Sequence, residues 1–186
     1  TVATLKGKYG NVVEGIPAIP KKDGYTPFGW FVGDTDEIFD ADTTINSNNM
    51  IVKAKYLEGI FNVYTVTFKV DGANYATKSV VEGYTIPKIP ADPSKENYVF
   101  EGWMIGNDMF DTTAPITSNI TLTAKFELKD INVKFFIDDT LAELYKTETV
   151  KYGSSMETLP KPVRDTYKFL GWKNIDGTDF TSDQIL

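Results

Sequence analysis

Hydrophobic and polar residues alternate in several short stretches of the chain, a pattern typical of half-buried β-strands. Residues 64–70, YTVTFKV, place Val66, Phe68 and Val70 on one face and polar residues on the other, and an Asp-Gly turn follows at 71–72. Comparable strands are predicted at 76–86, 98–105 and 120–127. No window of eleven or more residues has a helical period, so the predicted fold class is mainly β, and α+β at most.

The segment that joins two of these predicted strands is rich in proline. Residues 86–98 read IPKIPADPSKENY. Proline has no backbone N–H to give to a sheet, so this segment cannot be a central strand. We expect it to cross the surface, with one helical turn at most.

Three aromatic phrases that end in Gly-Trp recur along the chain. They are GYTPFGW at 24–30, NYVFEGW at 97–103 and TYKFLGW at 166–172. Their tryptophans are 73 and 69 residues apart, and Phe39, Phe110 and Phe180 follow at intervals of 71 and 70 residues. The regular spacing predicts three copies of one unit of about 70 residues.

The stretches around these phrases also align. Upstream, VVEGIPAIP at 12–20 aligns with VVEGYTIPKIP at 80–90, and VKYGSSMETLPKP at 150–162 aligns with both more loosely. Downstream, TINSNNMIVKAKY at 44–56 aligns with PITSNITLTAKFE at 115–127. The predicted copies occupy residues 1–57, 63–128 and 131–186.

The two outer copies are incomplete in this alignment. The second copy opens with YTVTFKV and the third with INVKFFI, whereas the first has only TVATLKG and a short approach to its VVEG. The first hairpin of the first copy is either shortened or missing. The third copy stops at Leu186, before any counterpart of residues 120–127, so we expect the chain to be a fragment of a longer protein.

Each copy is too small to bury much surface, so large aromatic side chains are expected to dominate its core. Tyr98 and Phe100 alternate as in a half-buried strand, which favours burial of the tryptophan beside them. Gly29, Gly102 and Gly171 precede the tryptophans and permit close backbone approach. The alternative is an exposed tryptophan in each copy that stacks on a sugar. The predicted core residues are Phe28, Trp30, Phe39, Phe100, Trp103, Phe110, Phe169, Trp172 and Phe180.

Composition removes many kinds of chemistry. The 186 residues include no cysteine and no histidine, which excludes disulfides, thiolate nucleophiles, His-assisted nucleophiles and the usual zinc, copper and haem ligands. A formal net charge of −7 would repel nucleic acid and anionic lipid. No apolar run approaches the roughly 18 residues of a membrane span. We therefore expect no cofactor, no nucleic-acid partner and no membrane insertion.

The densest cluster of charge is acidic. It is the segment DTDEIFDAD at 34–42, with carboxylates at Asp34, Asp36, Glu37, Asp40 and Asp42. Oxygen-rich loops can hold calcium, and Asp34 and Asp36 fit the first and third positions of an EF-hand loop. However, Ile38, Phe39 and Ile45 stand where an oxygen ligand, the turn glycine and the closing glutamate belong. A solvated turn is therefore the favoured interpretation, with cation binding as the alternative.

Two of these carboxylates could in principle form a glycosidase pair. That chemistry needs an acid and a base that face each other across a sugar-binding cleft. Small repeats with short loops do not build such a cleft. The sequence also has no glycine-rich phosphate loop, nucleophile elbow or metal motif. The chain is predicted not to be an enzyme.

Taken in order, these motifs resemble the Listeria/Bacteroides repeat of bacterial surface proteins, which is also called the internalin B-repeat. The resemblance rests on a strand, VVEG, a proline-containing crossing, YVFEGW, MFD and PITSNITLTAKFE, and it covers nearly the whole second copy. It implies a compact fold similar to the β-grasp, tandem arrays and an extracellular, wall-attached location. The first copy departs from the pattern at Pro27, which stands in the strand before Trp30.

The expected function is a stalk that spaces a distal adhesin or enzyme from a bacterial cell, in contact with neighbouring domains of the same chain. The alternative is an adhesion module that binds a host extracellular protein or glycan through its sheet edges or acidic loops. The junction at 128–130 spans only about 10 Å. The junction at 57–64 is too apolar for a free linker, and we expect it to pack between the first two copies. Both junctions predict an elongated array. The apolar residues of the longer junction are Leu57, Ile60, Phe61 and Val63.

Overall fold

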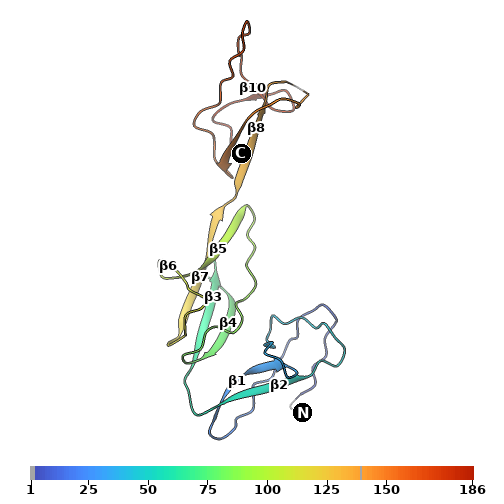
Figure 1. Ribbon diagram of the computed structural model, residues 1–186, viewed down its shortest axis with the longest axis vertical. Coiled ribbons are helices and arrows are strands. Elements are labelled where there is room, and N and C mark those ends of the chain that lie inside the picture. Colours follow the sequence, from blue (N-terminus) through green and yellow to red (C-terminus); the bar gives the residue numbers. More distant parts are fainter. Residues whose placement is uncertain (1–2, 139) are drawn as a thin grey trace. The chain divides into compact units, whose positions relative to one another are not determined.

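The computed structural model describes residues 3–138 and 140–186 (Figure 1). Within these ranges the chain forms strands, turns and extended segments, and it contains no helix. The prediction of a mainly β fold is confirmed, whereas the β-grasp arrangement and the elongated array stay predictions. The strands are β1 (Tyr25–Val32), β2 (Val52–Glu58), β3 (Val63–Val70), β4 (Ala73–Val81), β5 (Tyr98–Ile105), β6 (Asp108–Met109), β7 (Ile120–Leu128), β8 (Asp130–Phe136), β9 (Leu144–Lys151), β10 (Trp172–Lys173) and β11 (Asp179–Phe180).

The chain divides into two compact units. One consists of Thr1–Pro93 and Glu101–Lys125, and the other of Ser94–Phe100 and Phe126–Leu186. The junction between the first two predicted copies lies inside the first unit, and the junction between the last two lies inside the second. The division into copies at 1–57, 63–128 and 131–186 stays a prediction.

A five-stranded sheet in the order β4-β3-β7-β5-β6 contains most of the second predicted copy (Figure 1). β3 and β4 form an antiparallel hairpin around Asp71 and Gly72, whose φ angles are 48° and 83°. An Asp-Gly pair supplies the positive φ that such a tight turn requires. β3 also pairs in parallel with β7, with Phe68 opposite Leu122. The first and last long strands of this copy are therefore neighbours.

The core of this sheet follows from the alternation of residues 64–70. Val66 and Phe68 are 0% exposed, and so is Leu122 of β7, while Val80 of β4 is 1% exposed. Phe68 packs edge-on against Trp103, with their ring centroids 4.8 Å apart. Apolar side chains at every second position thus fill one side of β3, as the sequence pattern indicates.

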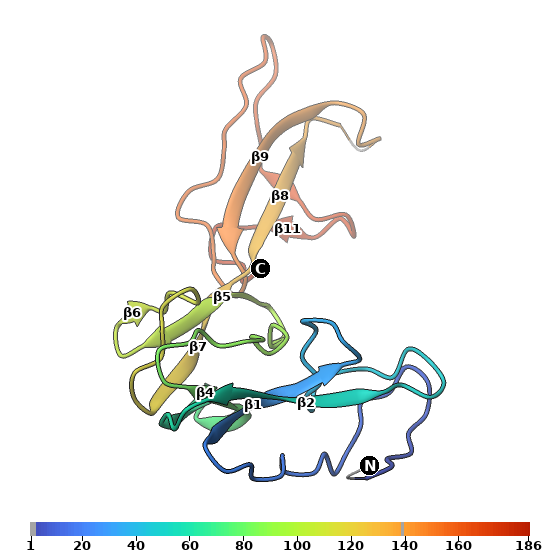
Figure 2. The same ribbon diagram turned by 60° about the horizontal axis from the view of Figure 1, so that its bottom comes forward.

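In the first copy, β1 and β2 form a two-stranded antiparallel sheet, and Figures 1 and 2 both show them side by side. The register shifts between Pro27 and Gly29 and continues with Trp30 opposite Ala54. A bulge therefore accommodates the proline, which cannot donate a ladder hydrogen bond.

The hydrogen bonds of the structure correct the alignment of the first copy. In each copy a glycine N–H donates to the carbonyl of a later apolar residue. The pairs are Gly10 and Ile45, Gly83 and Ile116, and Gly153 and Leu186. Gly10 thus takes the place of Gly83, so KYGNVVEGIP at 8–17 aligns with VEGYTIPKIP at 81–90. The sequence alignment of VVEGIPAIP with VVEGYTIPKIP is wrong because it matched identical letters that occupy different structural positions.

The burial of one apolar residue supports the corrected alignment. The third residue after each of these glycines is buried, and these residues are Val13, Ile86 and Met156. In the new alignment the residues before Gly10 hold the sequence position of β4 and β9. The described part of this segment, residues 3–9, forms no strand. Within the described residues, the first copy therefore has no strand at the position of β4.

The third copy contains the antiparallel hairpin β8-β9 and the short pair β10-β11. Its core consists of Phe135, Met156 and Trp172, and the rings of Phe135 and Trp172 have centroids 4.7 Å apart. This contact has the same residue types as the Phe68–Trp103 contact of the second copy. The partly buried residues packed against this core are Val133, Val150, Leu159, Phe169, Phe180 and Leu186.

Candidate functional site at the junctions between copies

The residues predicted to form the cores differ in their burial. Trp103, Phe39 and Trp172 are 3%, 8% and 9% exposed. The prediction passed over Phe31, which is 4% exposed. The alignment gives no signal for Phe31, because the residues after the other two tryptophans are methionine and lysine. The half-buried members of the predicted set are Phe28, Trp30, Phe100, Phe110, Phe169 and Phe180.

The two buried tryptophans are enclosed by aromatic rings from the same copy. The ring centroids of Tyr75 and Trp103 are 6.0 Å apart, and those of Tyr145 and Trp172 are also 6.0 Å apart. Each tyrosine comes from the second strand of its hairpin, and a phenylalanine of the first strand lies closer still. An indole enclosed in this way has no open face on which a sugar could stack.

Tryptophans also fix the proline-rich crossings. The Trp30 Nε1–H donates to the carbonyl oxygen of Pro17 at 2.8 Å, and the Trp172 Nε1–H donates to that of Pro160 at 2.7 Å. The two prolines are equivalent in the corrected alignment. A proline carbonyl without a ladder partner therefore obtains one from the indole.

The acidic segment of the first copy is bound by lysines. Lys53 Nζ lies 2.6 Å from Asp34 Oδ1, and Lys55 Nζ lies 2.8 Å from Asp36 Oδ1. The hydrogen bond and the charge of each lysine lower the pKa of its partner aspartate. Both aspartates are exposed, as is Glu37, so this half of the segment is a solvated turn.

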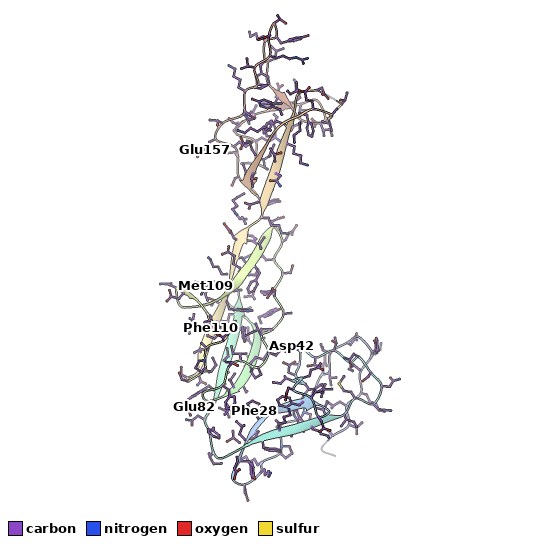
Figure 3. All side chains as sticks on the ribbon, in the orientation of Figure 1. Phe28, Asp42, Glu82, Met109, Phe110 and Glu157 are labelled. Atoms are coloured by element: carbon purple, nitrogen blue, oxygen red, sulfur yellow. The ribbon has the colours of Figure 1, made fainter. Side chains whose placement is uncertain are left out.

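The other half of the acidic segment contacts the second copy, and this contact was missed by the sequence interpretation. Lys78 of β4 lies 2.6 Å from Asp40 Oδ2 and 2.5 Å from Asp42 Oδ2, and Lys88 lies 3.3 Å from Asp40 Oδ1. The side chains of Lys78 and Asp40 are only 11% and 19% exposed. A solvated turn is therefore the wrong interpretation for Asp40. Figure 3 labels Asp42 in this cluster, which joins the first copy to β4.

The charges of this cluster stabilise one another. Burial pushes the pKa of Asp40 upward, but the hydrogen bond and charge of Lys78, aided by Thr43 and Lys88, hold it below its ordinary value of 3.8. Burial pushes the pKa of Lys78 downward, but Asp40 and Asp42 raise it above 10.5. Lys78 and Asp40 therefore remain charged across the neutral pH range.

The backbone of the first junction is fixed by a buried threonine. The Thr26 hydroxyl, in a residue 4% exposed, donates to the carbonyl oxygen of Gly59 at 2.8 Å and accepts from the N–H of Phe61 at 2.9 Å. At the other end of the linker, Asn62 Nδ2 donates to Glu82 Oε2 of the second copy at 2.8 Å. Three polar side chains thus hold the linker at both ends.

Of the four apolar side chains predicted to pack at this junction, Leu57 is half-buried in β2 and the other three are exposed. Ile60, Val63 and Phe61 are 80%, 49% and 43% exposed. The apolar contact between the copies is instead made by Phe28 and Tyr84, with ring centroids 5.0 Å apart. Figure 3 labels Phe28. The linker backbone is hydrogen-bonded to Thr26 at Gly59 and Phe61. The side chains of Ile60, Phe61 and Val63 remain exposed to solvent.

The second junction is held mainly by its backbone. Lys129 is the single residue between β7 and β8, and its N–H donates to the carbonyl of Asn97 at 2.9 Å. Its carbonyl accepts from the N–H of Tyr152 at 2.8 Å. Lys151 adds exposed ion pairs to Glu127 and Asp130, at 3.0 and 2.9 Å. One residue of the linker is thereby bonded to both flanking copies.

The described residues contain no group of three or more acidic, cysteine or histidine residues that could hold a metal ion. They also contain no helix long and apolar enough to cross a membrane.

The chain belongs to the Listeria-Bacteroides repeat family. The family model, described as the Listeria-Bacteroides repeat domain, matches residues 64–125 and 132–184. These matches cover the second and third aromatic phrases and the hairpins that precede them. The resemblance found in the sequence is confirmed.

Relatives include parts of longer bacterial proteins. A putative membrane protein of Evansella cellulosilytica is 30% identical over 181 residues, which are 92% of this chain and 26% of that protein. A putative Gly-rich membrane protein of the same organism is 28% identical over the whole chain and 22% of its own length. Internalin H of Listeria monocytogenes is 32% identical over 147 residues, 76% of this chain and 26% of that protein. The chain thus spans about a quarter of the length of these relatives.

Proposed function

We propose that this chain is a non-catalytic tandem-repeat module of a bacterial surface or secreted protein, and that it acts as a stalk. Membership of the Listeria-Bacteroides repeat family supports a repeat module. Two relatives are named membrane proteins and one is named an internalin, which supports a location at the bacterial surface. A stalk needs successive repeats that resist bending at their junctions.

The part-buried cluster of Lys78, Asp40 and Asp42 carries this proposal. A flexible linker would leave two repeats free to reorient, but here one lysine of the second copy binds two carboxylates of the first. Withdrawal of Lys78 would leave Asp40, which is 19% exposed, without its main counter-charge. Reorientation of the first copy is therefore costly. At the second junction, the two main-chain hydrogen bonds of Lys129 also restrict the reorientation of the linker.

Small-angle X-ray scattering tests the stalk. A stiff array should give a radius of gyration clearly above about 16 Å, the value for a compact globule of this length. Lys78→Met should broaden the distance distribution if the cluster fixes the first junction. A radius of gyration at the compact limit would contradict the stalk proposal, whatever the behaviour of the variant.

The absence of catalysis is part of the proposal. Among the described carboxylates of the acidic segment, Asp34, Asp36, Asp40 and Asp42 are each bound to a lysine ammonium group. The lysines lower the pKa of Asp34, Asp36 and Asp40, which makes these carboxylates weaker general bases at neutral pH. The expected result is no release of product from polysaccharide or peptide substrates.

Adhesion is the second candidate function, and one observation favours it. Ile60, Phe61 and Val63 expose a short apolar run at the first junction. Exposed apolar groups that lie together are typical of protein-binding surfaces. If the array binds a host extracellular protein here, capture should be saturable and Ile60→Asp should abolish it. A glycan array would detect the alternative ligand, and a pure stalk would bind neither.

A further inference from the structure

The linker between β2 and β3, together with the first residue of β3, forms an exposed apolar run. Its members are Ile60, Phe61 and Val63. Both flanking strands are paired, β2 with β1 and β3 with β4 and β7, so the run lies inside the described fold. Single exposed apolar residues are ordinary on a protein surface, but apolar residues that lie together within a polar rim mark an interaction site.

The second junction shows that a junction in this chain does not need such a run. Lys129 lies between β7 and β8, and none of the large apolar residues of these two strands is exposed. At the first junction, Thr26 binds the backbone of the linker and makes no use of its apolar side chains. The exposure of Ile60 and Phe61 is therefore not required to hold the two copies together.

Carboxylates lie around the apolar run. Glu58 comes directly before the linker and is exposed. Glu82 is hydrogen-bonded to the linker at Asn62, and Figure 3 labels Glu82. Asp23 is brought beside the linker because the N–H of Gly59 donates to the carbonyl oxygen of the residue after Asp23, at 2.8 Å. Within residues 3–138 and 140–186, none of these three carboxylates takes part in an ion pair.

Three lysines on neighbouring segments are held in other contacts. Lys22 Nζ lies 3.6 Å from the ring centroid of Tyr25, and Lys55 Nζ is bound to Asp36. Lys78 is bound to the acidic segment of the first copy. The formal net charge of −7 has the same sign as the carboxylates beside the linker. The apolar run is thus bordered by uncompensated negative charge, which attracts cationic groups and repels anionic ones.

These features define the chemistry of a partner. Apolar side chains of the partner would remove Ile60 and Phe61 from water. Basic side chains beside them would pair with Glu58 and Glu82, which would otherwise lose hydration without gaining a counter-charge. An acidic partner would place like charges together, and complementary charge is what selects one partner over another at an interface.

We propose that this apolar run and its carboxylates form a docking site for a basic, amphipathic segment of a partner protein. Aliphatic side chains of the segment cover Ile60, Phe61 and Val63, and its lysines or arginines pair with Glu58 and Glu82. The proposal rests on adhesion, the second candidate function, and adds to it the chemistry of the partner. The linker backbone keeps its bonds to the first copy, so docking leaves the junction intact.

The binding of short labelled peptides to the full chain tests this site. The first peptide alternates lysine and leucine, which places basic and apolar side chains on opposite faces of an extended strand. We expect saturable binding in fluorescence anisotropy, weakened as added salt screens the charges. A peptide that alternates glutamate and leucine, and one that alternates lysine and serine, should each bind at least about tenfold more weakly.

Charge variants of the chain locate the binding site. Glu58→Gln combined with Glu82→Gln removes two negative charges, while the new amide oxygen can still accept from Asn62. This double variant should bind the lysine–leucine peptide about tenfold more weakly. The matched control is Glu157→Gln combined with Asp165→Asn, which removes two exposed charges from the third copy and should bind normally.

An apolar variant tests the other half of the site. Ile60→Ser shortens a side chain that is 80% exposed, so the fold should persist while binding weakens about tenfold. Val163→Ser, at a position 92% exposed in the third copy, is the matched control and should bind normally. Circular dichroism checks that each variant is folded.

The proposal is overturned by no saturable binding of the lysine–leucine peptide up to about 1 mM. It is also overturned by equal binding of the glutamate–leucine peptide, or by equal losses in the two double variants, which would mean that the peptide responds only to net charge. Adhesion itself would survive these results if a host protein is still captured through Ile60. The stalk is judged separately, by scattering.

Discussion

The junction at residues 57–64 is held by side chains from the two copies, whereas the junction at 128–130 is held by the backbone of Lys129. The first is long enough to bend, so it needs the part-buried Lys78 cluster and the Thr26 hydroxyl to fix it. The second has one residue between strands and needs only two main-chain hydrogen bonds, with exposed ion pairs beside them. A longer linker in this chain thus depends more on charged side chains. Mutation and pH should affect the two junctions unequally.

The largest effect is expected from Trp103→Ala, because the second copy contributes to both junctions. Truncation of an aromatic residue that is 3% exposed should lower the free energy of unfolding by about 3–5 kcal/mol. Denaturant unfolding followed by circular dichroism measures this change. Trp30→Ala is the matched control, with a smaller effect because Trp30 is half-buried. An unfolding curve unmoved by Trp103→Ala would contradict the buried core.

The next effect separates the junctions directly. Lys78→Met leaves Asp40 and Asp42 without their shared ammonium group and should lower the free energy of unfolding by about 1.5–3 kcal/mol. Lys151→Met removes exposed ion pairs at the second junction, which are screened by solvent and salt, and should change stability within error. Calorimetry of both variants measures the contrast. Equal losses of stability in Lys78→Met and Lys151→Met would mean that the ion pairs of the two junctions contribute equally to the free energy of unfolding.

The pH dependence of the first junction follows from Asp40. Its folded pKa is below 3.8, so its stabilising contribution is present above the unfolded value and is lost as pH falls through the folded pKa. The melting temperature of Asp40→Asn should therefore lie below that of the unaltered chain near pH 6, and the gap should close in strongly acidic solution. If the difference in melting temperature persists at low pH, the ionised carboxylate of Asp40 is not its cause.

Raising the pH tests the same cluster from the other side. The folded pKa of Lys78 is above 10.5, so its contribution is full below 10.5 and declines as pH rises through the folded pKa. Alkaline titration of Lys78→Met should lack this component, which the unaltered chain should show.

The smallest effect is expected from calcium. Asp34, Asp36, Asp40 and Asp42 of the acidic segment are already bound to lysines, so a cation would have to displace ammonium groups from them. Millimolar calcium should leave the melting temperature within error of an EDTA control, because only binding to the native state would raise it. A reproducible rise of several degrees that disappears in Asp36→Ala would contradict this expectation and restore the calcium-binding alternative.

The sequence predicts the features that depend on local pattern. The alternation of residues 64–70 and the Asp-Gly pair are enough to place β3, its buried face and its turn, because strand periodicity is a property of neighbouring residues. Residues 98–105 form β5 over the predicted span. The second predicted strand, 76–86, instead forms over 73–81 as β4 and ends before the proline-rich crossing.

Contacts between copies could not be predicted in this way. Nothing near Lys78 in the sequence indicates that Asp40, 38 residues earlier, is its partner. Ile60 and Val63 are apolar, which suggested that they would be buried. However, the first copy contacts this linker through hydrogen bonds from Thr26 to the linker backbone, and not through these side chains. Identical letters also misled the alignment at VVEG, where main-chain hydrogen bonds identify Gly10 as the equivalent of Gly83.

The parallel pairing of β3 with β7 also determines how the second copy would carry a mechanical load. The chain enters this copy through β3 and leaves it through β7, so tension on the two ends draws these strands in opposite directions along their length. The hydrogen bonds between parallel strands are evenly spaced along the pair and would bear the force together. A pair that is pulled open from one end loses its bonds one at a time. Tension along the chain would therefore meet resistance until the whole β3-β7 pair yields in shear.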